Sequence, residues 1–94
     1  MQNELFFIIN TYGTKNQEDK AIEELAELQQ AILKHRECMN CETEKSLIDE
    51  IADVSVMLEQ LKIIYSCHKE VEERMDYKIE RQIKRIKKKY NIAD

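Results

Sequence analysis

The sequence predicts an all-α protein, a bundle of three or four helices in a single domain over residues 1–94. One Gly and no Pro leave the chain without the tight-turn residues that sandwiches, barrels and Gly-rich phosphate loops need. Glu, Lys, Leu and Ile, all tolerated or favoured in helices, are abundant. Apolar residues also recur at helical spacing in several segments, which favours amphipathic helices over strands.

The first half of the chain contains two predicted helices. An apolar stretch predicts a helix near residues 2–11, and Gly13, the only glycine, ends it. A second helix is expected from about 15 to 36. Before it, the segment from Thr14 to Gln17 has the Ser/Thr-x-x-Glu/Gln form of a capping box.

Two further helices are expected in the second half. Residues 38–43 lack a periodic apolar pattern and are interpreted as a loop, with Ser46 or Thr43 as the cap of the next helix. Spacings of four and three then place six residues on one stripe, as in a helix packed against another helix: Leu47, Ile51, Val54, Leu58, Leu61 and Tyr65. A last helix carries a second apolar stripe: Val71, Met75, Ile79, Ile86 and Tyr90.

Composition also suggests a location. The longest apolar run, residues 5–9, is far short of the roughly 20 residues that span a bilayer, and it lacks the flanks of a signal peptide. Three cysteines without a secretion signal suggest reduced thiols, so a cytoplasmic protein without membrane contact is expected. A zinc site from His35, Cys38 and Cys41 is not favoured, because about 30 Å of helix separates them from Cys67 and His68.

Charge is distributed unevenly along the chain. Residues 1–68 contain 6 Lys/Arg and 13 Asp/Glu, whereas residues 69–94 contain 9 and 6. A basic tail is one sign of a nucleic-acid contact. With a sequence pI near 5.3, a solvated and basic helix C-terminus explains it better, so no nucleic-acid partner is expected.

Four carboxylates border the predicted apolar faces. Glu24 and Glu27 lie about 60° apart on the second helix, and Glu50 and Asp53 repeat that geometry on the third. If these helices pack antiparallel through their apolar faces, all four carboxylates point into one small volume. Solvated acidic pairs are common on helices, and this interpretation stays open beside the metal site.

Carboxylates held so close repel one another and require a compensating cation. Oxygen ligands without His or Cys suit a hard ion such as Mg²⁺, with Mn²⁺ as a substitute. A di-iron bundle needs Glu-x-x-His pairs, but Ile32 and Tyr65 stand three residues before His35 and His68. The sequence therefore predicts a magnesium site rather than a di-iron site.

The order E-E-x-x-E followed by E-x-x-D resembles the MazG-like members of the all-α nucleoside triphosphate pyrophosphohydrolases. The resemblance covers about residues 15–90 and includes the flanking segments 21–28 and 49–54. It implies one MazG-like domain over residues 1–94 that binds Mg²⁺ through four residues: Glu24, Glu27, Glu50 and Asp53. It also implies hydrolysis of a nucleoside triphosphate at the α–β phosphate bond, giving the monophosphate and pyrophosphate.

Hydrolysis of a triphosphate also needs a general base and cationic side chains that bind the phosphates. Glu24 or Glu27 is a candidate for the general base, and the sequence does not separate base from ligand. Lys78 and Arg81 share a stripe of the last helix and are candidates to bind the triphosphate, although pairing with nearby glutamates is an alternative. A small domain and the resemblance both lead us to expect a homodimer or homotetramer that completes the bundle. The competing hypothesis is a non-enzymatic helical oligomerisation module.

Overall fold

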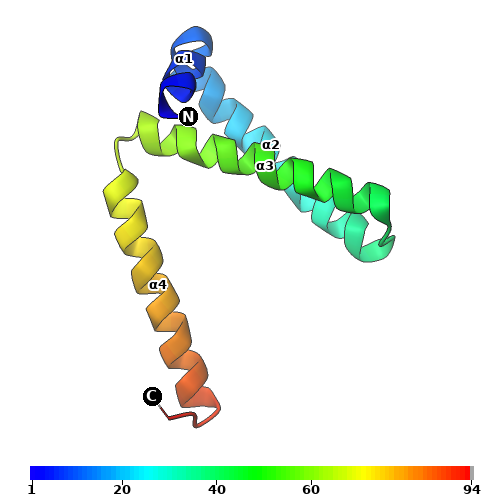
Figure 1. Ribbon diagram of the computed structural model, residues 1–94, viewed down its shortest axis with the longest axis vertical. Coiled ribbons are helices and arrows are strands. Elements are labelled where there is room, and N and C mark those ends of the chain that lie inside the picture. The colour runs from blue at the N-terminus through cyan, green and yellow to red at the C-terminus, as the bar shows by residue number, and fades with distance from the viewer. Residues whose placement is uncertain (94) are drawn as a thin grey trace.

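The computed structural model describes residues 1–93 and confirms the all-α class, because these residues form helices and no strand. The helices are α1 (Gln2–Tyr12), α2 (Thr14–Glu37), α3 (Cys41–Ile64) and α4 (His68–Lys89). Helices α2 and α3 form a long antiparallel hairpin. Helix α1 packs on both of them near the open end of this hairpin, where α2 begins and α3 ends (Figure 1). Helix α4 points away from the hairpin.

The turn between α1 and α2 depends on the single glycine. Gly13 has a φ of 92°, a conformation that other residues rarely adopt, and its N–H donates to the carbonyl of Ile9 at 2.8 Å. The predicted capping box is wrong. Gly13 is the N-cap of α2 without any side-chain cap bond, and Thr14 is already helical. The side chain of Gln17 has another partner, across the hairpin.

The start of α3 does carry a capping box, at a position different from the predicted one. Asn40 is the N-cap, and its side chain accepts from the N–H of Thr43 at 2.9 Å. The Thr43 hydroxyl in return accepts from the N–H of Asn40 at 3.0 Å. Thr43 is therefore the third residue of α3 and not its cap, and Ser46 lies inside the helix. These bonds end the loop earlier than the sequence indicated.

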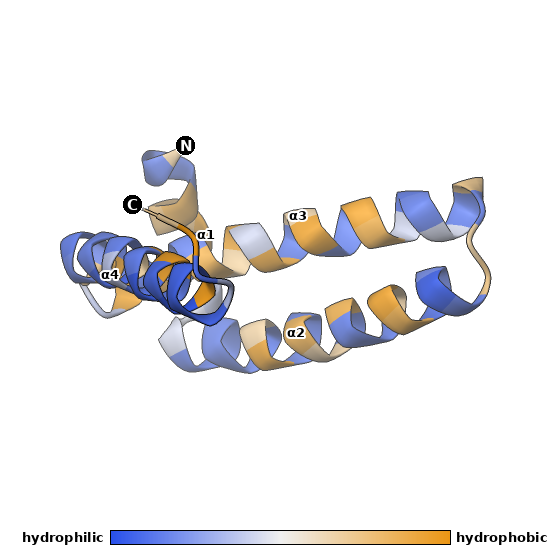
Figure 2. Cartoon of the chain, turned by 90° about the horizontal axis from the view of Figure 1, so that it is seen from below, coloured by the Kyte–Doolittle hydropathy of each residue, from blue (hydrophilic) through white to orange (hydrophobic). Residues whose placement is uncertain are grey.

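The core between α1, α2 and α3 is small. Its buried hydrophobic residues are Leu5, Ile9, Ala21, Ala31, Val54 and Met57. The most buried large side chain is polar: Gln60 is 2% exposed and accepts from Nε2 of Gln17 at 2.7 Å. The predicted α3 stripe is wrong in part, because Ile51, Leu58 and Tyr65 are exposed. Hydrophobic segments run along both helices of the hairpin (Figure 2), and only part of them faces the core.

A hydrogen-bonded elbow joins α3 to α4. The N–H of Cys67 donates to the carbonyl of Lys62 at 3.0 Å, and the N–H of Ser66 donates to that of Ile63 at 3.1 Å. Ser66 lies between them with a φ of 49°. This pair of bonds around one left-handed residue is a Schellman motif, which ends a helix and fixes the direction of the chain that follows.

Helix α4 has no buried residue. Among the described residues it contacts α3 alone, near the elbow. The predicted apolar stripe of α4 is exposed along nearly its whole length, and only Val71 is half-buried. Of the helices described over residues 1–93, none has the length and apolar character needed to cross a membrane.

Candidate metal centre

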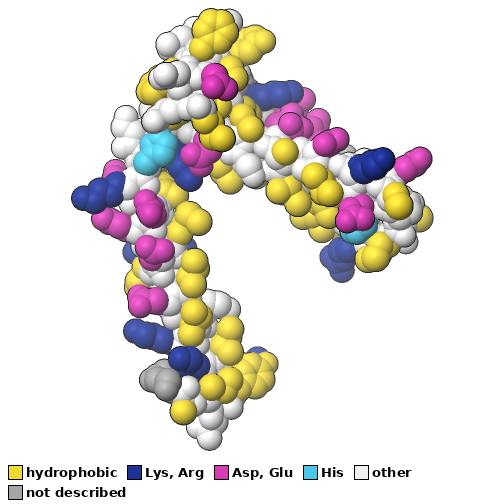
Figure 3. Space-filling view, in the orientation of Figure 1, with side chains coloured by type: hydrophobic (Ala, Val, Ile, Leu, Met, Phe, Trp, Pro, Cys, Tyr) yellow, Lys and Arg dark blue, Asp and Glu magenta, His cyan; other side chains and the backbone are white. Residues whose placement is uncertain are grey.

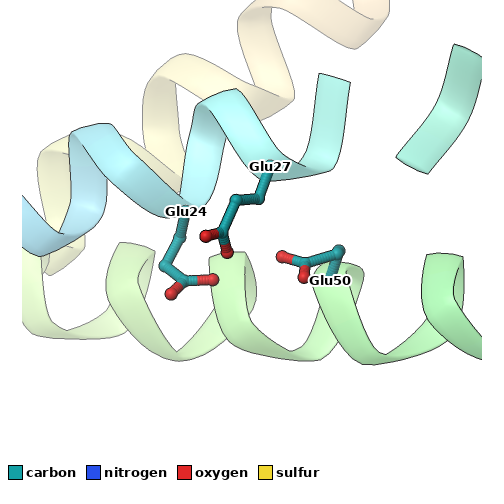
Figure 4. A group of neighbouring side chains, drawn as sticks. All are labelled: Glu24, Glu27 and Glu50. Carbon is teal, nitrogen blue, oxygen red and sulfur yellow. The ribbon is translucent and has the colours of Figure 1, made fainter. Parts of the chain in front are cut away.

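Three glutamates meet between the two helices of the hairpin. Glu24 and Glu27 extend from α2 and Glu50 extends from α3, and their carboxylates point toward one another (Figure 4). One carboxylate oxygen from each residue lies within 4.8 Å of the others. The i,i+3 spacing on α2 and the antiparallel packing of α3 produce this convergence, as expected from the sequence.

Glu24 is the innermost of the three and the one with a cationic partner. Its side chain is 8% exposed, and Oε1 lies 3.1 Å from Nζ of Lys20, one turn earlier on α2. The hydrogen bond and charge of Lys20 lower the pKa of Glu24 despite the burial of the carboxylate. The same bond raises the pKa of Lys20. Glu24 is therefore ionised at neutral pH.

The other two carboxylates lie close to that negative charge and form no ion pair with Lys20. The charge of Glu24, followed by burial, raises the pKa of Glu27. Burial raises the pKa of Glu50, and the charges of Glu27 and Glu24 add to it. Both shifts have the sign expected where like charges share a partly desolvated site.

Two oxygens in the cluster lack partners. Oε2 of Glu24 and Oε2 of Glu50 are buried and have no hydrogen-bond partner among the described residues. Unpaired carboxylate oxygens in such a position are costly unless a cation or a donor completes them. Three carboxylates and one lysine leave a formal charge of about −2, which a divalent ion balances. The donors, all carboxylate oxygens, suit Mg²⁺.

Asp53, the fourth predicted ligand, lies beside this group and not within it. It follows Glu50 by nearly one turn of α3, and its side chain is exposed. The cluster of close ligand atoms consists of the three glutamates and does not include Asp53. Its place next to the cluster keeps it a candidate ligand, because an Asp side chain three residues along lies on the same face of a helix.

The predicted phosphate-binding residues are not brought to the glutamates within one chain. Lys78 and Arg81 are on α4, which leads away from the hairpin. The guanidinium of Arg81 lies 5.6 Å from the ring centroid of Tyr77, and its Nε is buried without a hydrogen-bond partner among residues 1–93. Lys78 is exposed. Their proposed role therefore requires a second chain or a different position of α4.

The Cys and His residues form two groups at opposite ends of α3, as expected from the length of helix between Cys41 and Cys67. Cys38 and Cys41 are exposed at one end of α3, and Cys67 follows its other end. Nδ1 of His35 bonds to the Thr43 hydroxyl at 2.9 Å. Within the described part of the chain, the glutamate cluster is the only group of metal-ligand side chains found.

No family model, curated protein or solved structure matches this chain. The case for a function therefore depends on the residues themselves. Lys20 is not among the site residues predicted from the sequence, although its i,i+4 spacing to Glu24 is the usual signal of an ion pair on a helix. The bond between Gln17 and Gln60 has no local sequence pattern that could predict it, because the two residues are 43 positions apart.

Proposed function

We propose that the protein is a Mg²⁺-dependent nucleoside triphosphate pyrophosphohydrolase, which cleaves an NTP or dNTP at the α–β phosphate bond. The observation that carries the proposal is the convergence of Glu24, Glu27 and Glu50, two of them with buried, unpartnered oxygens. The order of these residues, together with Asp53, supports it through the resemblance to the MazG-like family.

The three glutamates would hold the ion, with Asp53 as the fourth candidate ligand. Bound Mg²⁺ supplies charge neutralisation for phosphate oxygens and activation of a water molecule. Glu27 is the better candidate for the general base, because Lys20 pairs with Glu24 and keeps its pKa low. A base with a raised pKa binds the proton it removes more firmly near neutral pH.

The substrate also needs cationic side chains on the side of its phosphates that faces away from the Mg²⁺ ion. Lys78 and Arg81 remain the candidates, and α4 of a neighbouring chain is the simplest source for them. A homodimer or homotetramer in the cytoplasm is part of this proposal.

The test is pyrophosphate release from a panel of NTPs and dNTPs with Mg²⁺. We expect Glu24→Gln, Glu27→Gln and Glu50→Gln each to lower turnover at least about 100-fold, and Asp53→Asn at least about tenfold. Asp49→Asn is the matched control, because Asp49 is next to Glu50 in the sequence and is exposed. Turnover unchanged by Glu50→Gln would disprove the assignment.

A second function has one observation in its favour. The exposed apolar stripes of α3 and α4 suit a non-enzymatic helical module that acts by association. This alternative predicts no turnover of any nucleotide and no stabilisation by Mg²⁺. Thermal unfolding with and without Mg²⁺ separates the two functions, because an ion that binds only the folded state must raise the melting temperature.

A further inference from the structure

The glutamate cluster has a cation next to it that comes from the same chain. Nζ of Lys20 lies 3.1 Å from Oε1 of Glu24 and 3.7 Å from Oε1 of Glu23. Of the ion pairs found among residues 1–93, the pair between Lys20 and Glu24 is the only one that includes a cluster glutamate. The lysine is one turn before Glu24 on α2, so the same helix carries this cation and two of the three carboxylates.

Lys20 has the capacity for a further hydrogen bond. Its ammonium has three N–H donors, and the carboxylates of Glu23 and Glu24 take two of them at most. The side chain of Lys20 is 49% exposed, whereas that of Glu24 is 8% exposed. The ammonium therefore lies between a buried carboxylate and the solvent, where a ligand of the cluster can reach it.

Other cations of the chain lie farther from the cluster. Lys15 pairs with Asp19 in the first turns of α2, and Lys62 pairs with Glu59 near the end of α3. Helix α4 leads away from the hairpin. On the face shown in Figure 3, hydrophobic side chains gather on the edge of the hairpin that faces α4, and acidic side chains gather along the opposite edge. Lys20 is therefore the cation that one chain offers to a ligand of the cluster.

The balance of charge at the cluster changes when a triphosphate binds. One divalent ion balances the three carboxylates and the ammonium of Lys20. The triphosphate then brings negative charge of its own, and sites of phosphoryl transfer supply cations for that charge. Lysine suits this role, because it is a compact charge with three donors on a flexible four-carbon stem.

We propose that Lys20 binds the phosphates of the substrate, from the same helix that carries the metal ligands Glu24 and Glu27. This inference rests on the proposed function and deepens it, because it assigns within one chain a contact that Lys78 and Arg81 make only from a neighbouring chain. The ligand class is a polyphosphate together with a divalent ion. Lys20 keeps its bond to Glu24 and donates a further bond to a phosphate oxygen.

A purely structural role of Lys20 makes a different prediction. If Lys20 only positions Glu24, its loss weakens the binding of Mg²⁺ and of polyphosphate alike. If Lys20 binds phosphate, Lys20→Gln weakens the binding of polyphosphate and strengthens that of Mg²⁺ alone, because a positive charge is removed from a site that a cation enters. The two roles therefore differ in the sign of the effect on Mg²⁺.

Isothermal titration calorimetry of the full chain measures both affinities, with Mg²⁺ alone and with inorganic triphosphate at saturating Mg²⁺. We expect Lys20→Gln to raise the Kd for triphosphate at least about tenfold and to lower the Kd for Mg²⁺ alone at least about threefold. Lys20→Arg keeps a cation and should stay within about threefold of the wild type for triphosphate.

Lys15→Gln is the matched control. The pair of Lys15 and Asp19 has the same i,i+4 spacing and the same 3.1 Å distance on α2 as the pair of Lys20 and Glu24, and it includes no cluster residue. Both Kd values should therefore stay within about twofold of the wild type in this variant.

Three results would overturn the proposal. They are a wild-type chain that binds no triphosphate in the presence of Mg²⁺, a triphosphate affinity that Lys20→Gln leaves unchanged, and an equal loss of Mg²⁺ and triphosphate affinity in that variant. No bond is cleaved in these titrations, so a chain that binds triphosphate through Lys20 and releases no pyrophosphate from any nucleotide supports this contact and contradicts the hydrolase. Nucleotide turnover that Lys20→Gln does not change supports the hydrolase and contradicts this contact.

Discussion

Nε2 of Gln17 donates to Oε1 of Gln60 across the hairpin, and this 2.7 Å bond lies at the most buried point of the chain. It joins the first turn of α2 to the last turns of α3, close to where α1 packs on both. A polar bond in this position sets the register of the two helices, because a shift of either helix leaves a buried amide unpaired.

Replacing one of these two glutamines should therefore lower the free energy of unfolding more than replacing both of them. We expect Gln60→Leu to lower the free energy of unfolding by about 1–3 kcal/mol, because it leaves the buried amide of Gln17 unsatisfied. The double change Gln17→Leu with Gln60→Leu should recover part of that loss. Urea denaturation measures both values, and Gln30→Leu on the exposed side of α2 is the control. A single variant as stable as the wild type would contradict this role.

The sequence was sufficient to predict the four helices, since each depends on local spacing and on the absence of Pro. It also predicted that four carboxylates converge if α2 and α3 pack antiparallel, and the structure brings three of them together, Glu24, Glu27 and Glu50, without Asp53. It did not predict which part of the α3 stripe is buried, since Ile51 and Leu58 are as hydrophobic as Val54. The direction of α4 depends on three backbone conformations at the elbow, and no residue there signals them.

Mg²⁺ should stabilise the wild-type chain and not Glu50→Gln. The ion would complete the unpartnered oxygens of Glu24 and Glu50, and at 100 times its dissociation constant it adds about 2.7 kcal/mol. Without Mg²⁺, Glu50→Gln should melt a few degrees higher than the wild type, because it removes one of three repelling charges. Differential scanning calorimetry measures both effects, with Asp49→Asn as the control. An equal response of the two proteins to Mg²⁺ would rule out Glu50 as a ligand.

The advantage of Glu50→Gln in the metal-free protein should depend on pH. Burial and neighbouring charges raise the pKa of Glu50 above its usual value, so the folded protein binds this proton more tightly than the unfolded chain does. The destabilising effect of Glu50 is therefore fully present above its raised pKa and disappears as the pH falls below its usual pKa. Melting temperatures of the two proteins should converge on acidification. A difference that widens toward low pH would contradict the sign.

The capping box of α3 should contribute measurably to stability. The Thr43 hydroxyl accepts from the N–H of Asn40 and also bonds to His35, which ties the end of α2 to the start of α3. Thr43→Ala should lower the free energy of unfolding by about 1 kcal/mol. Ser46→Ala, three residues later on the exposed side of α3, is the control and should have a smaller effect. Thermal denaturation followed by circular dichroism provides the measurement, and equal effects of the two changes would argue against the cap.

Helicity should rise with protein concentration. Helix α4 has no buried residue within one chain, so packing against a second chain would add to the stability of its 22 residues. We expect the circular dichroism signal at 222 nm to increase on association and to stay low for Ile79→Asp. Tyr77→Asp should follow the wild type. A signal that is independent of concentration in a monomeric protein would show that α4 is stable alone.

The elbow at Ser66 gives α4 the properties of a lever. A helix of 22 residues is about 33 Å long, so a rotation of about 10° at its base moves its far end by about 6 Å. The smallest changes in sequence with the largest effect on shape are therefore expected at residues 65–67. A glycine at position 66 would keep the left-handed turn without strain. A β-branched residue there would disfavour this backbone conformation and change the direction of α4.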